Sequence, residues 1–159
     1  MSRSFTIVRV FIGALVLACL AGCESAPDCT FTGEGDKAYT AGCLVLHDNE
    51  LLLVEAMGSK WGPPGGTVRP NESAQCGAER ETWEETSVAV SAQELALAFD
   101  NGFHLYWCTP VGAPTPEVRA PLEIMTVGFF PPGDFAQLNW RYPDQGAVFY
   151  NMVKQKAGR

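Results

Sequence analysis

The stretch Gly65–Val88, GGTVRPNESAQCGAERETWEETSV, concentrates carboxylates at fixed spacing. Glu81, Glu84 and Glu85 stand at positions i, i+3 and i+4, which places three like charges on one face of a helix. Such pairs destabilise a helix by roughly 0.2–0.5 kcal/mol each, so a cation among them would offset the repulsion. Carboxylate oxygens suit Mg²⁺ or Mn²⁺ better than zinc. The alternative interpretation is an acidic helix face that only meets solvent.

The same stretch resembles the signature of the Nudix hydrolases, G-x5-E-x7-R-E-U-x-E-E-x-G-U, in which U is a bulky aliphatic residue. Two positions depart from it, because Thr82 replaces an aliphatic residue and Ser87 replaces a glycine. A threonine hydroxyl can bond back to a helix carbonyl, and a serine that ends a helix in the left-handed conformation costs on the order of 1 kcal/mol. Neither change removes a carboxylate. The matching residues are Gly66, Glu72, Arg80, Glu81, Glu84, Glu85 and Val88.

The resemblance covers about residues 40–153 and implies both a fold and an activity. The fold would be an α/β/α sandwich with a mixed β-sheet. The activity would be hydrolysis of a nucleoside diphosphate linked to another group, with Mg²⁺ or Mn²⁺ as cofactor. The predicted metal ligands are Glu81, Glu84, Glu85 and the backbone carbonyl of Gly65, with Glu85 bridging and Glu81 acting as ligand or general base.

The remaining positions of the signature imply supporting roles. Arg80 belongs to the predicted catalytic set and would be fixed by pairing with Glu84 or Glu72. Gly66 and Glu72 would support the junction between the loop and the helix. Glu123 is a further candidate ligand or base, although a glutamate at the edge of a strand has many ordinary uses.

The flanking sequence predicts a single α+β domain. Ala41–His47 and Leu51–Glu55 read as a hairpin, and the loop Lys60–Gly66 follows them. Ser73 is the expected N-cap of the acidic helix. Further predicted strands are 88–90, 95–99, 103–109 and 122–130, the last pairing with 103–109; Asp144 would cap a final helix to about Lys156, with Val148, Phe149, Met152 and Val153 turned inward.

The chain begins with a pattern typical of a bacterial lipoprotein signal. Arg3 and Arg9 precede the apolar run Val10–Leu20, which is too short to span a hydrocarbon core of ~30 Å at ~1.5 Å per residue. Leu20-Ala21-Gly22-Cys23 then resembles a lipobox, with acylation at Cys23. The predicted organisation is a signal peptide over 1–22, a tether or arm over 23–39 and a Nudix domain over 40–159, lipid-anchored in the cell envelope and facing the periplasm. An ordinary secretory signal is the alternative.

The charge of the chain argues against nucleic acid as a partner. The formal net charge is −7, and it would become −9 once the two signal arginines are removed. An acidic protein is a poor binder of a phosphate backbone or an anionic lipid surface. The resemblance implies a small pyrophosphate compound as the partner, and the membrane would be reached only through the anchor.

Four cysteines would remain besides Cys19 of the signal and the acylated Cys23. An even number in an oxidising compartment predicts two disulfides, with three pairings open. We expect Cys76 to pair with Cys108, under the acidic helix, and Cys29 with Cys43, tying the arm to the first strand. A zinc site is the alternative, but no C-x-x-C pair is present.

Two function classes stay open at this point. The first is a metal-dependent hydrolase, and the second is an inactive lipoprotein that keeps the fold as a binding or scaffold module. The presence of every acid of the signature favours the enzyme. The aromatic residues Phe103, Tyr106, Trp107 and Trp140 could stack on a base or fill the core, and core is the simpler interpretation.

Overall fold

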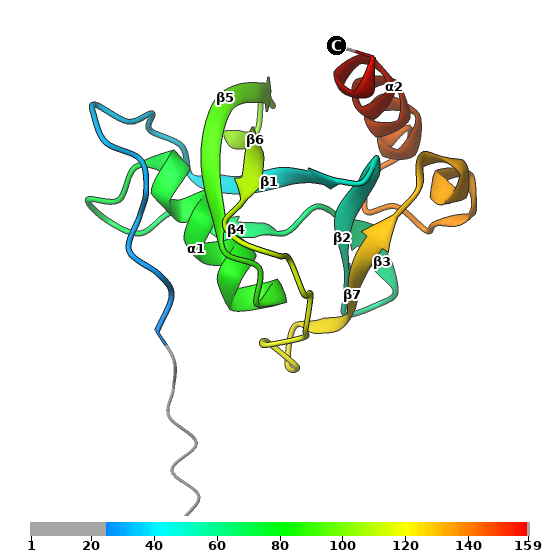
Figure 1. Cartoon of the computed structure of the whole chain (residues 1–159), viewed down its shortest axis with the longest axis horizontal. Coiled ribbons are helices and arrows are strands. Elements are labelled where there is room, and N and C mark those ends of the chain that lie inside the picture. The colour runs from blue at the N-terminus through cyan, green and yellow to red at the C-terminus, as the bar shows by residue number, and fades with distance from the viewer. Residues whose placement is uncertain (1–24, 159) are drawn as a thin grey trace, which may run out of the picture.

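The computed structural model describes residues 25–158, which form a mixed β-sheet with a helix on each side (Figure 1). This architecture confirms the predicted α+β sandwich. The predicted signal and its acylation site Cys23 lie outside the described residues. The strands are β1 (Thr40–His47), β2 (Glu50–Ala56), β3 (Lys60–Gly62), β4 (Gly65–Thr67), β5 (Val90–Ala98), β6 (Phe103–Pro110) and β7 (Ile124–Phe130); the helices are α1 (Ala74–Thr86), the 3₁₀ helix η1 (Pro132–Gln137) and α2 (Gln145–Ala157).

Side chains of the central strands point alternately to the two faces of the sheet, and they form one hydrophobic core on each face. On β1, Ala41, Cys43 and Val45 pack in a cluster with α1, whereas Leu44 packs with Phe149 of α2. Successive side chains of a strand point to opposite faces, so a continuous apolar strand supplies both cores. The site-bearing helix α1 is therefore held against a sheet that is itself buried on its other side.

The strands follow the order β3-β2-β1-β6-β5. β1 and β6 are parallel, in register from Thr40 opposite Phe103 to Val45 opposite Cys108, and the other named pairs are antiparallel. The predicted pairing of 122–130 with 103–109 is wrong, because β7 pairs with β2 instead. The loop before β7 crosses the end of α1, where the Glu117 amide donates to the Thr86 carbonyl, and this crossing delivers β7 to the far strands.

Two local predictions also need correction. The loop predicted over Lys60–Gly66 contains the short strands β3 and β4, which pair with β2 and β1 respectively. The strands predicted over 88–90 and 95–99 are one element, β5, with register irregularities between Ala92 and Leu97. Short pairings and bulges leave weak periodicity in a sequence, so pattern alone does not reveal them.

α2 closes the second core and follows the prediction closely in its bounds. Phe149 and Val153 are buried, and Met152 is half-buried against them. Val148 was predicted to point inward and is instead 41% exposed. Asp144 precedes the helix in the left-handed conformation, with φ of 61°, and its side chain makes no capping bond.

The segment before β1 lies along α1 and is attached to it. The Thr30 amide and hydroxyl donate to the two carboxylate oxygens of Glu79, at 2.8 and 2.7 Å. Asp36 accepts from the hydroxyl of Tyr106 at 2.9 Å, and its amide donates to Gln75 at 3.0 Å. Residues 29–36 thus form a docked arm.

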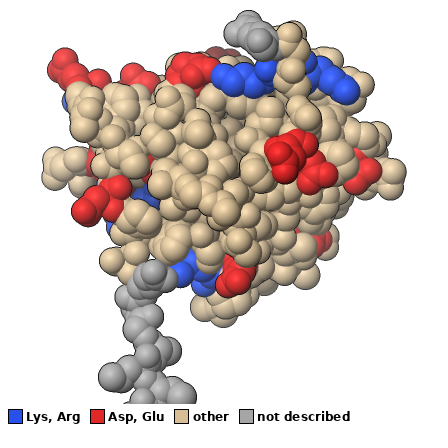
Figure 2. Space-filling model, in the orientation of Figure 1, with Lys and Arg blue, Asp and Glu red and all other residues tan. Residues whose placement is uncertain are grey.

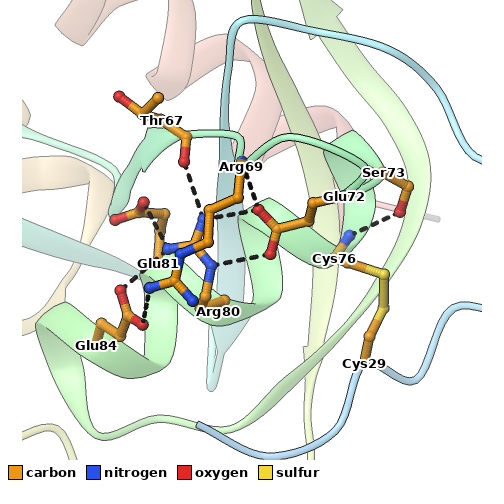
Figure 3. Close-up of polar contacts among 9 residues, drawn as sticks. All are labelled: Cys29, Thr67, Arg69, Glu72, Ser73, Cys76, Arg80, Glu81 and Glu84. Atoms are coloured by element: carbon orange, nitrogen blue, oxygen red, sulfur yellow. Dashed lines mark hydrogen bonds and ion pairs between the residues drawn. A yellow bond between two sulfur atoms is a disulfide. The ribbon is translucent and has the colours of Figure 1, made fainter.

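The predicted disulfide pairing is wrong. The structure joins Cys29 to Cys76 and Cys43 to Cys108, in place of Cys76 with Cys108 and Cys29 with Cys43. Cys43 and Cys108 lie on the parallel neighbours β1 and β6, on the face that meets α1, with their Cα atoms 5.5 Å apart. Cys76 lies in the first turn of α1, on the side where the arm docks (Figure 3).

The surface carries scattered acidic side chains in the view of Figure 2, whereas basic side chains gather near the C-terminal end of α2. Lys154 and Lys156 occupy the last turn of that helix, where positive charge is favourable. Among residues 25–158, no helix has the length and apolarity needed to cross a membrane.

Candidate active site

The sequence positions α1 through ordinary capping at both ends. The hydroxyl of Ser73 accepts a bond from the Cys76 amide at 3.2 Å, as the N-cap prediction requires. Ser87 takes the left-handed conformation, with φ of 62°, and its amide bonds to the Trp83 carbonyl. The hydroxyl of Thr82 is fully buried and bonds back to the Ala78 carbonyl at 2.8 Å, so this departure from the signature is satisfied inside the helix.

Arg80 lies at the centre of the polar network (Figure 3). It is 8% exposed, and Nε and Nη2 make a two-pronged contact with Glu72, at 2.9 and 2.8 Å. Its Nη1 donates to Glu81 at 2.7 Å and to Glu84 at 3.0 Å. Nη2 also donates to the Thr67 carbonyl of β4. Arg80 therefore contacts both carboxylates proposed for it and a third one besides, and it links α1 to the glycine-containing strand.

Glu72 supports the junction between loop and helix. Besides Arg80, it accepts a bond from the backbone amide of Arg69 at 2.8 Å, which closes the turn before α1. The hydrogen bonds from the Arg80 guanidinium are the main reason that the pKa of Glu72 lies below its usual range. The same contacts with Glu72 raise the pKa of Arg80, so each partner stabilises the charged form of the other.

Glu85 is buried, being 8% exposed, with a single hydrogen bond from the Gly65 amide at 3.0 Å. Its pKa is raised to about 8, with burial as the main cause; the hydrogen bond from the Gly65 amide opposes this increase, and the charge of Glu81 adds to it. Weaker effects come from Arg141, which lowers this pKa, and from Glu123, which raises it. A carboxylate in this condition gains much from a cation.

Glu81 lies between Arg80 and the glycine loop. Burial raises its pKa, and the bond from Arg80 opposes that change. A Cβ added at Gly66 would come within 2.6 Å of the Glu81 carboxylate, so a larger residue there would displace this carboxylate from its present position. The glycine at 66 therefore has a steric reason in the site itself.

The free oxygens of the site fit a hard divalent cation. Glu81 uses Oε1 toward Arg80 and Glu85 uses Oε2 toward Gly65, which leaves Glu81 Oε2 and Glu85 Oε1 as acceptors. Glu84 has both oxygens engaged, one with Arg80 and the other with Arg69 at 2.9 Å. An all-oxygen donor set is what Mg²⁺ and Mn²⁺ prefer.

The carboxylates do not converge as a finished metal cluster. Within the described part of the chain, no group of three or more His, Cys, Asp or Glu side chains is arranged to hold a metal ion. The cause is visible in Figure 3, where the carboxylates of Glu81 and Glu84 turn toward Arg80. A metal would draw on the free oxygens of Glu81 and Glu85 first, and Glu84 would have to share or release a guanidinium.

A cavity of about 490 Å³ lies over these groups. Gly65, Gly66, Glu81, Glu84, Glu85 and Glu123 line it. Glu123 directly precedes β7, and the amide of Met57 donates to its carbonyl at 3.0 Å, which holds it at the edge of this cavity. The structure thus brings all the predicted ligands and the additional candidate Glu123 to one place.

The four aromatic candidates divide between core and cavity. Tyr106 is fully buried, and Trp140 donates its indole N–H to the Phe135 carbonyl within the α2 core. Trp107 is half-buried, with Lys156 5.1 Å from its ring. Phe103 lines a second cavity, next to the first.

Two arginines at the site carried no sequence signal. Arg69 occupies an unspecified position of the signature yet bonds to Glu84. Arg141 lies 55 positions beyond the end of α1 at Thr86. Its charge acts on Glu85 only because the chain returns past β3, where the Arg141 amide bonds to the Trp61 carbonyl. Only tertiary contacts reveal either one.

Comparison with known proteins supports the same identification. Residues 36–151 match the family profile described as "NUDIX domain". A "MutT-like protein" of Streptomyces ambofaciens is 37% identical over 62 residues, which are 38% of this chain, and the match spans only 40% of that protein.

Solved structures show the same fold at low identity. An ADP-ribose pyrophosphatase from Streptococcus suis superposes with a TM-score of 0.64 at 18% identity, over 76% of this chain and 91% of that one. A UDP-X diphosphatase superposes with a TM-score of 0.59 at 19% identity, over 79% of this chain and 66% of that one.

Proposed function

The chain belongs to the Nudix family, and from this premise we propose that it is a divalent-metal-dependent pyrophosphohydrolase. Its substrate would be a nucleoside diphosphate linked to another group. The observation that carries the proposal concerns two neighbouring carboxylates. Glu85 is buried and accepts one hydrogen bond, and Glu81 keeps one oxygen without a partner. Both lie against Gly65 and Gly66, here called the glycine wall, which leaves room for a ligand. The related solved enzymes named above act on compounds of this class, namely ADP-ribose and UDP-X.

The residues of the site divide the work in this proposal. A divalent cation held by Glu81, Glu85, the Gly65 carbonyl and Glu84 would neutralise the phosphates and activate a water. Arg80 would orient Glu81 and Glu84, since it bonds to both while anchored to Glu72. The arginine thus serves as a positioning residue.

The general base of the proposed reaction comes from the carboxylates around the cavity. Glu81 and Glu123 are the two candidates, because both line the cavity and neither is engaged by two guanidinium groups as Glu84 is. The base must reach the attacking water at hydrogen-bond distance.

A phosphate-release screen tests the proposal. Sugar nucleotides, dinucleoside polyphosphates, coenzymes and lipid-linked pyrophosphates are incubated with the protein, separately with Mg²⁺, with Mn²⁺ and with a chelator. We expect metal-dependent release from at least one class. Metal binding without release from any class would instead favour the inactive binding module.

We also propose that the protein is anchored to the bacterial envelope through an acylated Cys23, on the strength of the sequence Leu20-Ala21-Gly22-Cys23 after an apolar run. Replacing Cys23 by serine should release the protein from membranes into the soluble fraction. A Cys23→Ser protein that still sediments with membranes after a carbonate wash would rule out the lipid anchor.

A further inference from the structure

A second cavity of about 300 Å³ lies beside the carboxylates, on the other side of the glycine wall. Gly65 and Gly66 line both cavities, so a ligand crossing these two residues reaches from one to the other. The first residues of β1 and β6, Thr40 and Phe103, form part of its lining, and Gln145, the first residue of α2, forms another part. Its volume is at the small end for ligand pockets.

The two amide side chains in this cavity have a fixed orientation. The backbone amide of Phe103 donates to Oδ1 of Asn101 at 3.1 Å, and the backbone amide of Tyr142 donates to Oε1 of Gln145 at 3.3 Å. A backbone N–H can bond only to the oxygen of such a side chain, so this contact decides which end is which. Both NH₂ groups are thereby left as donors for a ligand.

The charges that line the cavity also favour a ligand with hydrogen-bond acceptors. Arg141 lines it, and the set of lining residues contains no aspartate or glutamate, although the chain has 18 acids against 11 lysines and arginines. The hydroxyls of Thr40 and Tyr142 can donate or accept. The charged and amide side chains therefore offer more hydrogen-bond donors than acceptors, which suits a ligand rich in acceptors.

Flat apolar surface is also present. Phe103 lies over Gly42 of β1, where an added Cβ would come within 3.1 Å of its ring. Tyr142 stands at the rim and is 51% exposed. Any nucleobase can stack on aromatic faces of this kind, because every base has a flat π-face.

We propose that this cavity holds the nucleoside monophosphate half of the substrate and selects a base that presents carbonyl oxygens, such as uracil, through the NH₂ groups of Asn101 and Gln145. Arg141 binds the phosphate that leads across Gly65 and Gly66 to the carboxylates. That the bound nucleotide is half of a substrate rests on the proposed function. The preference for a base with carbonyl oxygens follows from the residues that line the cavity.

UMP and CMP are the test ligands because their bases differ at one edge: uracil presents the C4 carbonyl and an N3–H, whereas cytosine presents a C4 amino group and an unprotonated N3. The ¹⁵N-labelled protein is titrated with each nucleotide in the presence of a chelator, and side-chain amide signals are followed by NMR. We expect UMP to bind roughly fivefold more tightly than CMP or better, a ratio typical of one or two hydrogen bonds. Shifts of the Asn101 and Gln145 NH₂ signals should accompany UMP binding.

The variants Gln145→Glu and Asn101→Asp turn each donor into an acceptor and keep the oxygen that the backbone amide needs. Both should reduce or reverse the ratio of UMP to CMP affinity, and the ratio cancels the effect of the added charge because both ligands carry the same phosphate. Asn151→Asp is the control, since it adds the same charge on an exposed position of α2. Arg141→Met should weaken both ligands about tenfold and leave the ratio intact, whereas Lys154→Met should change neither.

Equal affinity for UMP and CMP, absence of binding by both, or a ratio unchanged by Gln145→Glu and Asn101→Asp would overturn the inference. The titration uses no metal and no turnover, so its outcome is independent of the proposed activity. If the protein hydrolyses pyrophosphates but does not prefer UMP over CMP, the proposed function is supported and the inference is wrong. If the protein prefers UMP but hydrolyses no pyrophosphate compound, the inference is supported and the proposed function is wrong.

Discussion

Glu79 and Glu85 are two glutamates of one helix with nearly equal burial and opposite surroundings. They are 7% and 8% exposed. Glu79 accepts three hydrogen bonds from neutral donors, the Thr30 amide, the Thr30 hydroxyl and the Ala92 amide, at 2.7–2.9 Å. Glu85 accepts one, from Gly65, and has other carboxylates as neighbours.

The difference separates a buried charge that serves structure from one that serves chemistry in the proposed function. Three donors compensate the desolvation of Glu79, so this residue holds the arm and β5 to α1. Glu85 lacks that compensation, and its pKa rises to about 8. The deficit at Glu85 is what a cation would fill, which makes unsatisfied burial the sign of the functional member of the pair.

The largest expected effect comes from Glu85→Gln. The change keeps the shape and the bond from Gly65 but removes the charge that would hold the metal, so turnover should fall by ~10³-fold or more. The measurement is the initial rate on a substrate identified in the release screen. Glu79→Gln is the matched control and should keep most of its rate per folded molecule. An active Glu85→Gln enzyme would remove Glu85 from the catalytic set.

The next largest effect concerns the disulfide that attaches the Glu79 side to the arm. Replacing Cys29 and Cys76 together by serine opens a link across 47 residues, and the chain-entropy model gives a loss of ~4 kcal/mol. Urea unfolding measures it, and the bonds from Thr30 to Glu79 should weaken in parallel, as seen by amide exchange.

Peptide mapping of the unreduced protein checks the pairing itself. Fragments joining Cys29 to Cys76 and Cys43 to Cys108 are expected. A fragment joining Cys76 to Cys108 would contradict the structure on this point.

Glu79→Gln should have a moderate effect on stability. One of the two oxygens becomes an NH₂ group that faces a donor, which leaves a buried donor unpaired and costs ~2 kcal/mol. Chemical unfolding measures the loss. Glu85→Gln should show no such loss in the metal-free protein, and an equal loss in both variants would mean that the two sites do not differ as described.

The smallest effect is a pH dependence in the metal-free protein. The pKa of Glu85 is raised from 4.5 to about 8, so between these values the folded protein holds a proton that the unfolded chain has released. Stability from this group is therefore greatest below pH ~4.5 and falls as pH rises toward 8. We expect Tm of the wild type to drop by at least ~5 °C more than that of Glu85→Gln over this range.

The carboxylate side of α1 could be predicted because its spacing is a local property. Residues 81, 84 and 85 share a face of any helix, and the preceding glycines stand at fixed distance from them. The central strands β1, β2 and β6 were equally readable, since their apolar runs and the Asp48-Asn49 turn are signals within one segment.

What the sequence could not show depends on contacts between distant segments. The predicted partner of β7 was wrong because the loop before β7 crosses the end of α1 and brings this strand to β2. The disulfides were wrong because four cysteines alone do not say which side of α1 Cys76 faces. Glu79, Arg69 and Arg141 were missed for the same reason, since each matters only through residues that the fold brings to it.

Metal binding tests the central claim most directly. Free Mn²⁺ is measured by electron paramagnetic resonance during titration of the wild type, Glu85→Gln and Glu79→Gln at pH 7.5. We predict that the wild type and Glu79→Gln bind Mn²⁺ with the same affinity, whereas Glu85→Gln binds it ~100-fold more weakly or worse. Equal Mn²⁺ affinity of the wild type and Glu85→Gln would show that the carboxylate of Glu85 does not bind the metal.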